Sequence, residues 1–329
     1  MDDLHLVTSV NGGYVMRHQL NDLGYSDAQI RKALRDNILQ RVRHGTYVPS
    51  ATWSSMSTTQ RHCVLARSVL DKLGKGVVAS HHTAAALHGH DLYGVDLETI
   101  HVTRLDGRSG RKEAGIVYHH GSIVPDADVR EVDRLLVTAP MRAVFESASL
   151  LSVESGMVLA SSALRTRSFT REELLDHGTR FAHWLGTRRA RLSIQLADGR
   201  LETVGEVRSL HMMWRHRIPH PELQYVVKTA DGRFLARTDF AWVLHRHIGE
   251  FDGLVKYGRL NPFVNDPGRS ITDEKVREDL VRSEDFGVSR WVWAGLNAGS
   301  QAETARAIVR GMEQSRRLYT RNGVIIPLS

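Results

Sequence analysis

The stretch TDFAWVLHRHIGEFDGLVKY, residues 238–257, has the pattern of two short core strands but carries several charged side chains. Among them are Asp239, Glu250, Asp252 and Lys256. Charged side chains are rarely buried unless they are paired with one another or bind a metal ion. The stretch therefore indicates a chemical site.

A tight turn centred on Leu244 and His245 would place Asp239 directly opposite Glu250, since both lie equally far from that centre. Cross-strand partners have Cβ atoms roughly 4.5–5.5 Å apart. Asp252 shares a strand face with Glu250, because side chains alternate between the faces of a strand. Carboxylates this close repel one another. A hard divalent cation such as Mg²⁺ or Mn²⁺ would remove the conflict.

The flanking segments supply the elements that would position this site. Residues 202–217, ETVGEVRSLHMMWRHR, predict a helix with Glu202 and Glu206 on one face. Residues 219–227, PHPELQYVV, predict a strand that carries Gln224. A charged helix in residues 271–287 and an aromatic strand in residues 288–296 would follow. The predicted order is helix, strand, strand, strand, helix, strand.

This order, with EFDG at residues 250–253, resembles the PD-(D/E)XK nuclease superfamily over residues 200–298. It is most similar to the very-short-patch-repair-like branch. The resemblance implies a Mg²⁺- or Mn²⁺-dependent DNA endonuclease, a phosphodiester hydrolase. By it, Asp239 and Glu250 are the principal metal ligands, Glu206 is the helix acid and Gln224 is a nearby polar contact.

The chain departs from the superfamily pattern two residues after the glutamate, where the pattern has a lysine. Asp252 stands there and is a further candidate metal ligand. Lys256 lies one turn further on and could return its ammonium group to the site. That ammonium would offset charge on the scissile phosphate in the transition state.

Residues 13–50 predict a helix, a turn, a second helix and a hairpin. The first helix, YVMRHQLNDLG, ends at Gly24, and the second begins at Ser26 with Gln29 at capping-box spacing. This order is that of a winged helix-turn-helix, which places its second helix in the major groove of double-stranded DNA. The candidate DNA-binding residues are Arg31, Lys32, Arg35, Arg41 and Arg43. A winged domain that makes protein contacts, with a solvated basic face, is the alternative.

The first half of the chain is also similar to the AbiEi-type antitoxins of bacterial type IV toxin–antitoxin pairs. The similarity covers roughly residues 10–150 and includes SHHTAAALHG at residues 80–89. It implies repression of the protein's own promoter through the winged domain, and a cognate toxin as a partner. On this alternative the chain is an antitoxin or transcriptional repressor, and its nuclease-like region is an inert scaffold.

Histidines are frequent between residues 60 and 195, a region that predicts mixed helices and strands. The spacing of these histidines is not that of a HExxH metal site, so helix capping and polar core packing is the favoured interpretation. They are His81, His82, His88, His119 and His120. Cys63 is the single cysteine, which excludes an internal disulfide and a cysteine-based zinc site, and its place in an amphipathic helix indicates core packing. No G-x-S-x-G, P-loop or Rossmann fingerprint occurs in the sequence.

The whole chain of 329 residues, with 41% hydrophobic and 25% charged residues, predicts a multidomain α/β protein. We expect a winged helix-turn-helix domain over 1–52, a mixed α+β antitoxin-like domain over 53–195 and a restriction-endonuclease-like α/β domain over 196–329. The net charge of +7 permits a polyanionic partner. The acidic start MDDLHLVTSV is unlike a signal peptide, and no apolar run reaches the roughly 20 residues that span a bilayer. We therefore expect a cytoplasmic protein without membrane contact that acts in phage defence, a toxin–antitoxin pair or DNA repair.

Overall fold

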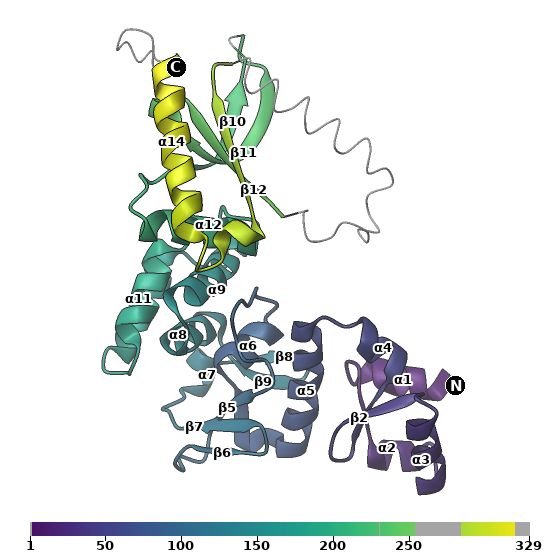
Figure 1. Cartoon of the computed structure of the whole chain (residues 1–329). Coiled ribbons are helices and arrows are strands. Elements are labelled where there is room, and N and C mark those ends of the chain that lie inside the picture. The colour runs from purple at the N-terminus through teal and green to yellow at the C-terminus, as the bar shows by residue number, and fades with distance from the viewer. Residues whose placement is uncertain (1, 230, 254–283, 320–329) are drawn as a thin grey trace. The chain divides into compact units, whose positions relative to one another are not determined.

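The computed structural model describes residues 2–229, 231–253 and 284–319. It is a mixed α/β protein with several sheets (Figure 1). The chain divides into two compact units, one of residues 1–163 and 168–195 and the other of residues 164–167 and 196–329. Among the described residues, every helix is too short or too polar to cross a lipid bilayer.

The first unit begins with three helices and a three-stranded sheet of order β1-β3-β2. These elements are α1 (Asp2–Val10), β1 (Val15–Met16), α2 (Arg17–Asp22), α3 (Asp27–Arg35), β2 (Leu39–Arg43) and β3 (Thr46–Pro49). Their core consists of Val15, Leu20, Ile30, Leu39 and Tyr47. The predicted capping box at the start of α3 is confirmed, because Ser26 Oγ accepts a hydrogen bond from Gln29 N, and Gln29 Oε1 accepts one from Ser26 N.

One prediction for this region is wrong at its start. The segment YVM at residues 14–16 was expected to be helical, but Val15 and Met16 form strand β1 and pair with Tyr47 and Thr46 of β3. Helix α2 begins only at Arg17. Val15 and Met16 are buried and pair with β3, which lies much later in the chain. The local sequence pattern on which the helix prediction was based contains no information about this partner.

The rest of the first unit is a six-stranded sheet of order β6-β7-β5-β4-β9-β8 with helices packed against it. Its strands are β4 (Val77–Ala79), β5 (Ile100–Arg104), β6 (Arg111–Glu113), β7 (Ile116–His119), β8 (Val129–Val132) and β9 (Leu135–Thr138). Helices α5 (Thr58–Leu73) and α6 (His81–Leu87) pack on this sheet, whereas α4 (Ser50–Ser55) packs on β2 and β3. The further helices are α7 (Pro125–Asp128), α8 (Pro140–Leu150), α9 (Val153–Arg165), α10 (Arg171–His177) and α11 (Thr187–Leu196). The single cysteine, Cys63, packs against the core on α5 as predicted, and burial raises the pKa of its thiol.

The second unit contains a four-stranded sheet of order β10-β11-β12-β13. Its elements are α12 (Val204–Arg215), β10 (Glu222–Lys228), β11 (Phe234–Trp242), β12 (His247–Asp252), β13 (Gly287–Val292) and α14 (Gln301–Tyr319). The first three strands are antiparallel neighbours, and β13 runs parallel to β12. Helix α14 packs against β12 and β13 and runs along the sheet in Figure 1. The helix predicted within residues 271–287 lies almost wholly outside the described residues.

The predicted pairing of the two central strands is confirmed. A short 3-10 turn, η3 (Val243–His245), joins β11 to β12. Phe240 pairs with Gly249 and Trp242 pairs with His247, which is the register that follows from a turn centred on residues 244 and 245.

Candidate functional site

Three of the predicted site residues of the second unit lie at one level across its sheet. Leu223, Phe240 and Gly249 pair across β10, β11 and β12. The sequence neighbours of these three residues on one side of the level are Gln224, Asp239 and Glu250. On the fourth strand, Arg290 of β13 pairs with Glu250. We call Gln224, Asp239, Glu250 and Arg290 the polar row.

Glu206 joins the polar row from helix α12. It is 5% exposed and lies in the first turn, where a negative charge interacts favourably with the helix dipole. Its Oε1 accepts a hydrogen bond from Thr203 Oγ1 at 2.7 Å, and its Oε2 accepts one from Glu202 N at 2.9 Å. Gln224 Nε2 donates to Oε2 at 2.9 Å. The helix acid and the polar strand residue of the sequence prediction are therefore in direct contact.

Gln224 has an unusual backbone conformation, with φ of 55°. Both of its neighbours keep the ladder to β11, so the conformation is confined to one residue. A non-glycine residue in the left-handed region costs on the order of 1–3 kcal/mol and persists only where its surroundings hold it. Such strain is concentrated at functional sites, and here it coincides with the contact to Glu206.

The two central carboxylates have protein partners as well. Asp239 is half-buried, and its Oδ2 accepts a hydrogen bond from Phe251 N at 2.9 Å. Glu250 is 9% exposed, and its Oε2 lies 3.0 Å from Nη2 of Arg290. Asp252 is half-buried at the end of β12, and Lys256 lies outside the described residues.

Among the described residues, Asp239, Glu250 and Asp252 do not bring three ligand oxygens within 4.8 Å of one another, with or without Glu206, so the predicted convergence of three carboxylates is not observed. Within the described ranges, one group of three His, Cys, Asp or Glu side chains has all its ligand atoms within 4.8 Å of one another, and it consists of His81, His101 and His119 in the first unit. Of these three, His101 was missed by the sequence interpretation. Arg290 was missed too, although an arginine within the aromatic strand VSRWVWAGL was a visible signal.

The predicted DNA-binding residues divide into two groups. Arg31, Lys32 and Arg35 are exposed on α3, and Arg41 is exposed on β2. Arg43 is half-buried instead, and its Nη2 donates to the backbone oxygen of Ala114 at 2.7 Å. Arg43 therefore holds the hairpin against the turn between β6 and β7.

A second contact holds the same hairpin. Lys72 Nζ of α5 donates a hydrogen bond to the backbone oxygen of His44 at the hairpin turn. Burial lowers the pKa of Lys72, and the nearby Arg43 lowers it further. The turn between β2 and β3 is thus fixed within the first unit from two sides.

Comparison with known proteins gives relatives for most of the chain. No protein-family model matches it. Over 223 residues, 67% of this chain, it is 30% identical to the uncharacterized protein MT2308 of Mycobacterium tuberculosis strain CDC 1551 / Oshkosh. The same identity and extent hold for the uncharacterized protein Rv2248 of strain H37Rv, and the match covers 79% of each relative. The chain belongs to the family of these two mycobacterial proteins. Their names state no activity.

Proposed function

We propose that this protein binds double-stranded DNA through a winged helix-turn-helix over residues 1–52 and cleaves it with a PD-(D/E)XK-type endonuclease domain over residues 196–329. The observation that carries the proposal is the polar row with Glu206 attached to it. Its acids come from the helix and the strands where the resemblance to the nuclease superfamily expects them.

DNA binding is supported by the order of elements in the first 50 residues. The order α1, β1, α2, α3, β2, β3, with β3 between β1 and β2, agrees with the order expected for a winged helix-turn-helix. In that arrangement α3 is the helix that enters the major groove. Its Arg31, Lys32 and Arg35 are exposed while Ile30 faces the core, so the basic side chains are free to meet phosphates and base edges.

Cleavage is supported by the donor types in the row. Carboxylate oxygens suit Mg²⁺ or Mn²⁺, and Asp239 and Glu250 stand on neighbouring strands. A cation held by both would compete with Arg290 for Glu250, because that carboxylate already has an ion pair. When bound, the metal would polarise a scissile phosphodiester and favour attack by water. Glu206 and Gln224 would orient the site, and Lys256 is the candidate to balance charge on the phosphate.

A regulatory function is the second candidate, and a specific observation favours it. The carboxylates of Glu206, Asp239 and Glu250 each have a hydrogen-bond or ion-pair partner within the fold, as expected of a structural network. On this proposal the protein is an AbiEi-like antitoxin or repressor, and the second unit is an inert scaffold or binds a toxin.

Plasmid cleavage separates the two candidates. Supercoiled plasmid is incubated with Mg²⁺ or Mn²⁺ and with wild type, Asp239→Asn or Glu303→Gln. The last variant removes an exposed acid from α14 as a matched control. The endonuclease proposal expects nicking by wild type and the control, with a loss of at least a hundredfold in Asp239→Asn. No metal-dependent cleavage by a wild type that still binds DNA would favour the regulator.

A further inference from the structure

Five histidines of the first unit gather beside helix α6, and the proposed DNA cleavage does not use them. They are His62 of α5, His81 and His82 of α6, His101 of β5 and His119 of β7. We call this set the histidine cluster. Its members come from four separate elements, so it is formed by the tertiary fold.

The sheet register brings two of these side chains to one face. Strands β5 and β7 are parallel neighbours, and Thr103 of β5 pairs with His119. His101 lies two residues before Thr103 and therefore points to the same side. Helix α6 starts directly after β4 and packs on β5, which places His81 over this face.

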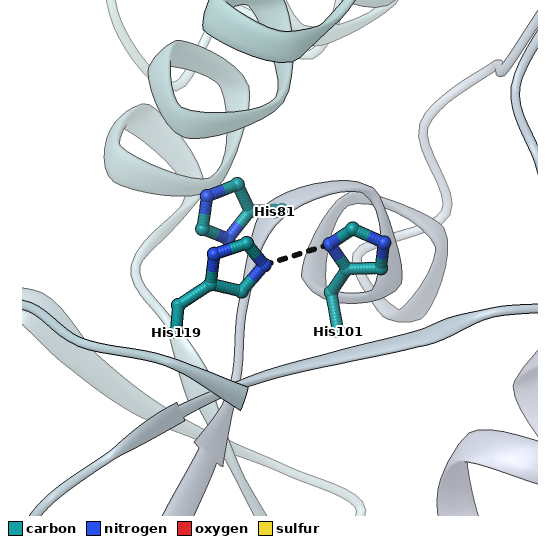
Figure 2. Close-up of side chains that lie close together, drawn as sticks. All are labelled: His81, His101 and His119. Carbon is teal, nitrogen blue, oxygen red and sulfur yellow. Dashed lines mark hydrogen bonds between the residues drawn. The ribbon is translucent and has the colours of Figure 1, made fainter. Parts of the chain in front are cut away.

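The three rings lie close enough to share one ion (Figure 2). His101 Nδ1 and His119 Nε2 are 2.8 Å apart, and the rings of His81 and His119 are stacked with centroids 3.6 Å apart. One ligand nitrogen from each ring lies within 4.8 Å of the other two. Ligand nitrogens around a tetrahedral zinc ion are separated by roughly 3.3 Å. Small side-chain movements would therefore convert the observed arrangement into a coordination site.

The surroundings of His81 resemble the outer shell of a metal site. Glu146 is fully buried, and its Oε2 lies 3.8 Å from His81 Nδ1 and accepts a hydrogen bond from His81 N at 3.2 Å. Its Oε1 accepts a hydrogen bond from Arg142 Nε at 2.7 Å. Ser80 Oγ lies 3.1 Å from the same His81 Nδ1, and a hydrogen bond at the second nitrogen of a ligand histidine fixes the orientation of its ring. The backbone of His81, with φ of 52°, is held in the left-handed region at this point.

A cavity of about 320 Å³ adjoins two of the three rings. His81 and His119 line it, together with Arg142 and Glu146. Arg142 is fully buried, and its Nη2 has no hydrogen-bond partner in the described part of the chain. Space and an unsatisfied cationic donor beside the rings would accommodate water or a small anion next to a bound ion.

We propose that His81, His101 and His119 bind a divalent transition metal ion such as Zn²⁺, with one coordination position open to the cavity. Imidazole ligands select Zn²⁺ and similar ions, whereas Mg²⁺ prefers oxygen. Three protein ligands with one open position are the arrangement of catalytic zinc sites rather than structural ones. The site is separate from the polar row and does not depend on the proposed endonuclease.

Titration of the metal-free full-length protein with Co²⁺, a visible reporter for Zn²⁺, tests the site. We expect one equivalent to bind with the absorption of a histidine-coordinated ion, and Zn²⁺ to displace it. His119→Asn should weaken binding by at least a hundredfold. His18→Asn replaces an exposed histidine of α2 that does not line the cavity, and this variant should bind like wild type.

Three outcomes would overturn the proposal, and the first requires no variant. The first is a wild type that binds no stoichiometric Co²⁺ or Zn²⁺. The second is binding that is lost in Asp239→Asn, which would place the ion at the polar row. Unchanged binding by a folded His119→Asn variant, checked by circular dichroism, would count equally against it.

Discussion

At the scale of single residues, Glu206 combines a structural role with a proposed functional one. It accepts hydrogen bonds from the Thr203 hydroxyl, the Glu202 amide and the Gln224 side chain. The first two stabilise the start of α12, and the third reaches the polar row. Its contribution to folding can therefore be measured apart from any activity.

We predict that Glu206→Ala lowers the free energy of unfolding by about 1–3 kcal/mol, because it removes three hydrogen bonds to a buried carboxylate. Urea denaturation followed by circular dichroism measures the change. Glu303→Ala removes an exposed first-turn acid from α14 and should change stability by no more than about 0.5 kcal/mol. Equal effects of the two substitutions on the free energy of unfolding would show that the hydrogen bonds of Glu206 do not stabilise the fold.

The two arginines of the hairpin strand β2 should behave differently when replaced. Arg41 is exposed, whereas Arg43 is bonded to the backbone of Ala114. We expect Arg41→Ala to weaken binding to duplex DNA without any decrease in stability. Arg43→Ala should instead lower the unfolding free energy by about 1 kcal/mol, because it removes the hydrogen bond to Ala114. Fluorescence anisotropy and urea denaturation of both variants check this, and a reversed pattern would contradict the assignment.

At the scale of elements, the structure separates what local sequence patterns predict from what they miss. The capping box of α3 and the register of β11 with β12 were predictable, because each depends on residues close together in the chain. Strand β1 and the Glu250–Arg290 pair were not, since their partners lie about 30 and 40 residues away. His101 was overlooked for the same reason, because the fold and not the spacing brings it to His81 and His119.

Helix α3 is the element on which proposed DNA recognition depends. Replacing Arg31, Lys32 and Arg35 together by alanine should weaken duplex binding strongly. It should also flatten the dependence of log K on log salt by about 0.9 for each phosphate that the variant no longer neutralises. The matched control replaces Arg306, Arg310 and Arg317 together by alanine, which removes three exposed charges from α14. The proposal fails if both variants bind like wild type with the same salt slope.

At the scale of the whole molecule, the histidine cluster should make stability depend on pH. Burial lowers the pKa of His82 and of His119 to about 4, whereas histidines of an unfolded chain titrate near 6.5. Between these values the unfolded state binds protons that the folded state does not, so stability is present above pH 6.5 and is lost as pH falls. The slope is about 1.4 kcal/mol per pH unit for each such histidine.

Urea denaturation in EDTA at a series of pH values tests this dependence. His119→Asn should lower the slope of unfolding free energy against pH by about 1.4 kcal/mol per pH unit, which is the contribution of one histidine proton. A wild-type unfolding free energy that stays constant from pH 6.5 to 4.5 would contradict the expected burial of neutral histidines.

The central proposal is that Asp239 and Glu250 hold a divalent cation at a site that Glu206 orients, and thermal melting with Mg²⁺ tests it most directly. Mg²⁺ is chosen because the histidine cluster does not suit it. A ligand at 100 times its Kd stabilises the folded form by about 2.7 kcal/mol. Asp239→Asn keeps an oxygen that can accept the hydrogen bond from Phe251 but lacks the charge. We predict that Mg²⁺ raises the Tm of wild type above its value in EDTA and hardly changes that of Asp239→Asn. An unchanged wild-type Tm, or an equal rise in the variant, would contradict the claim.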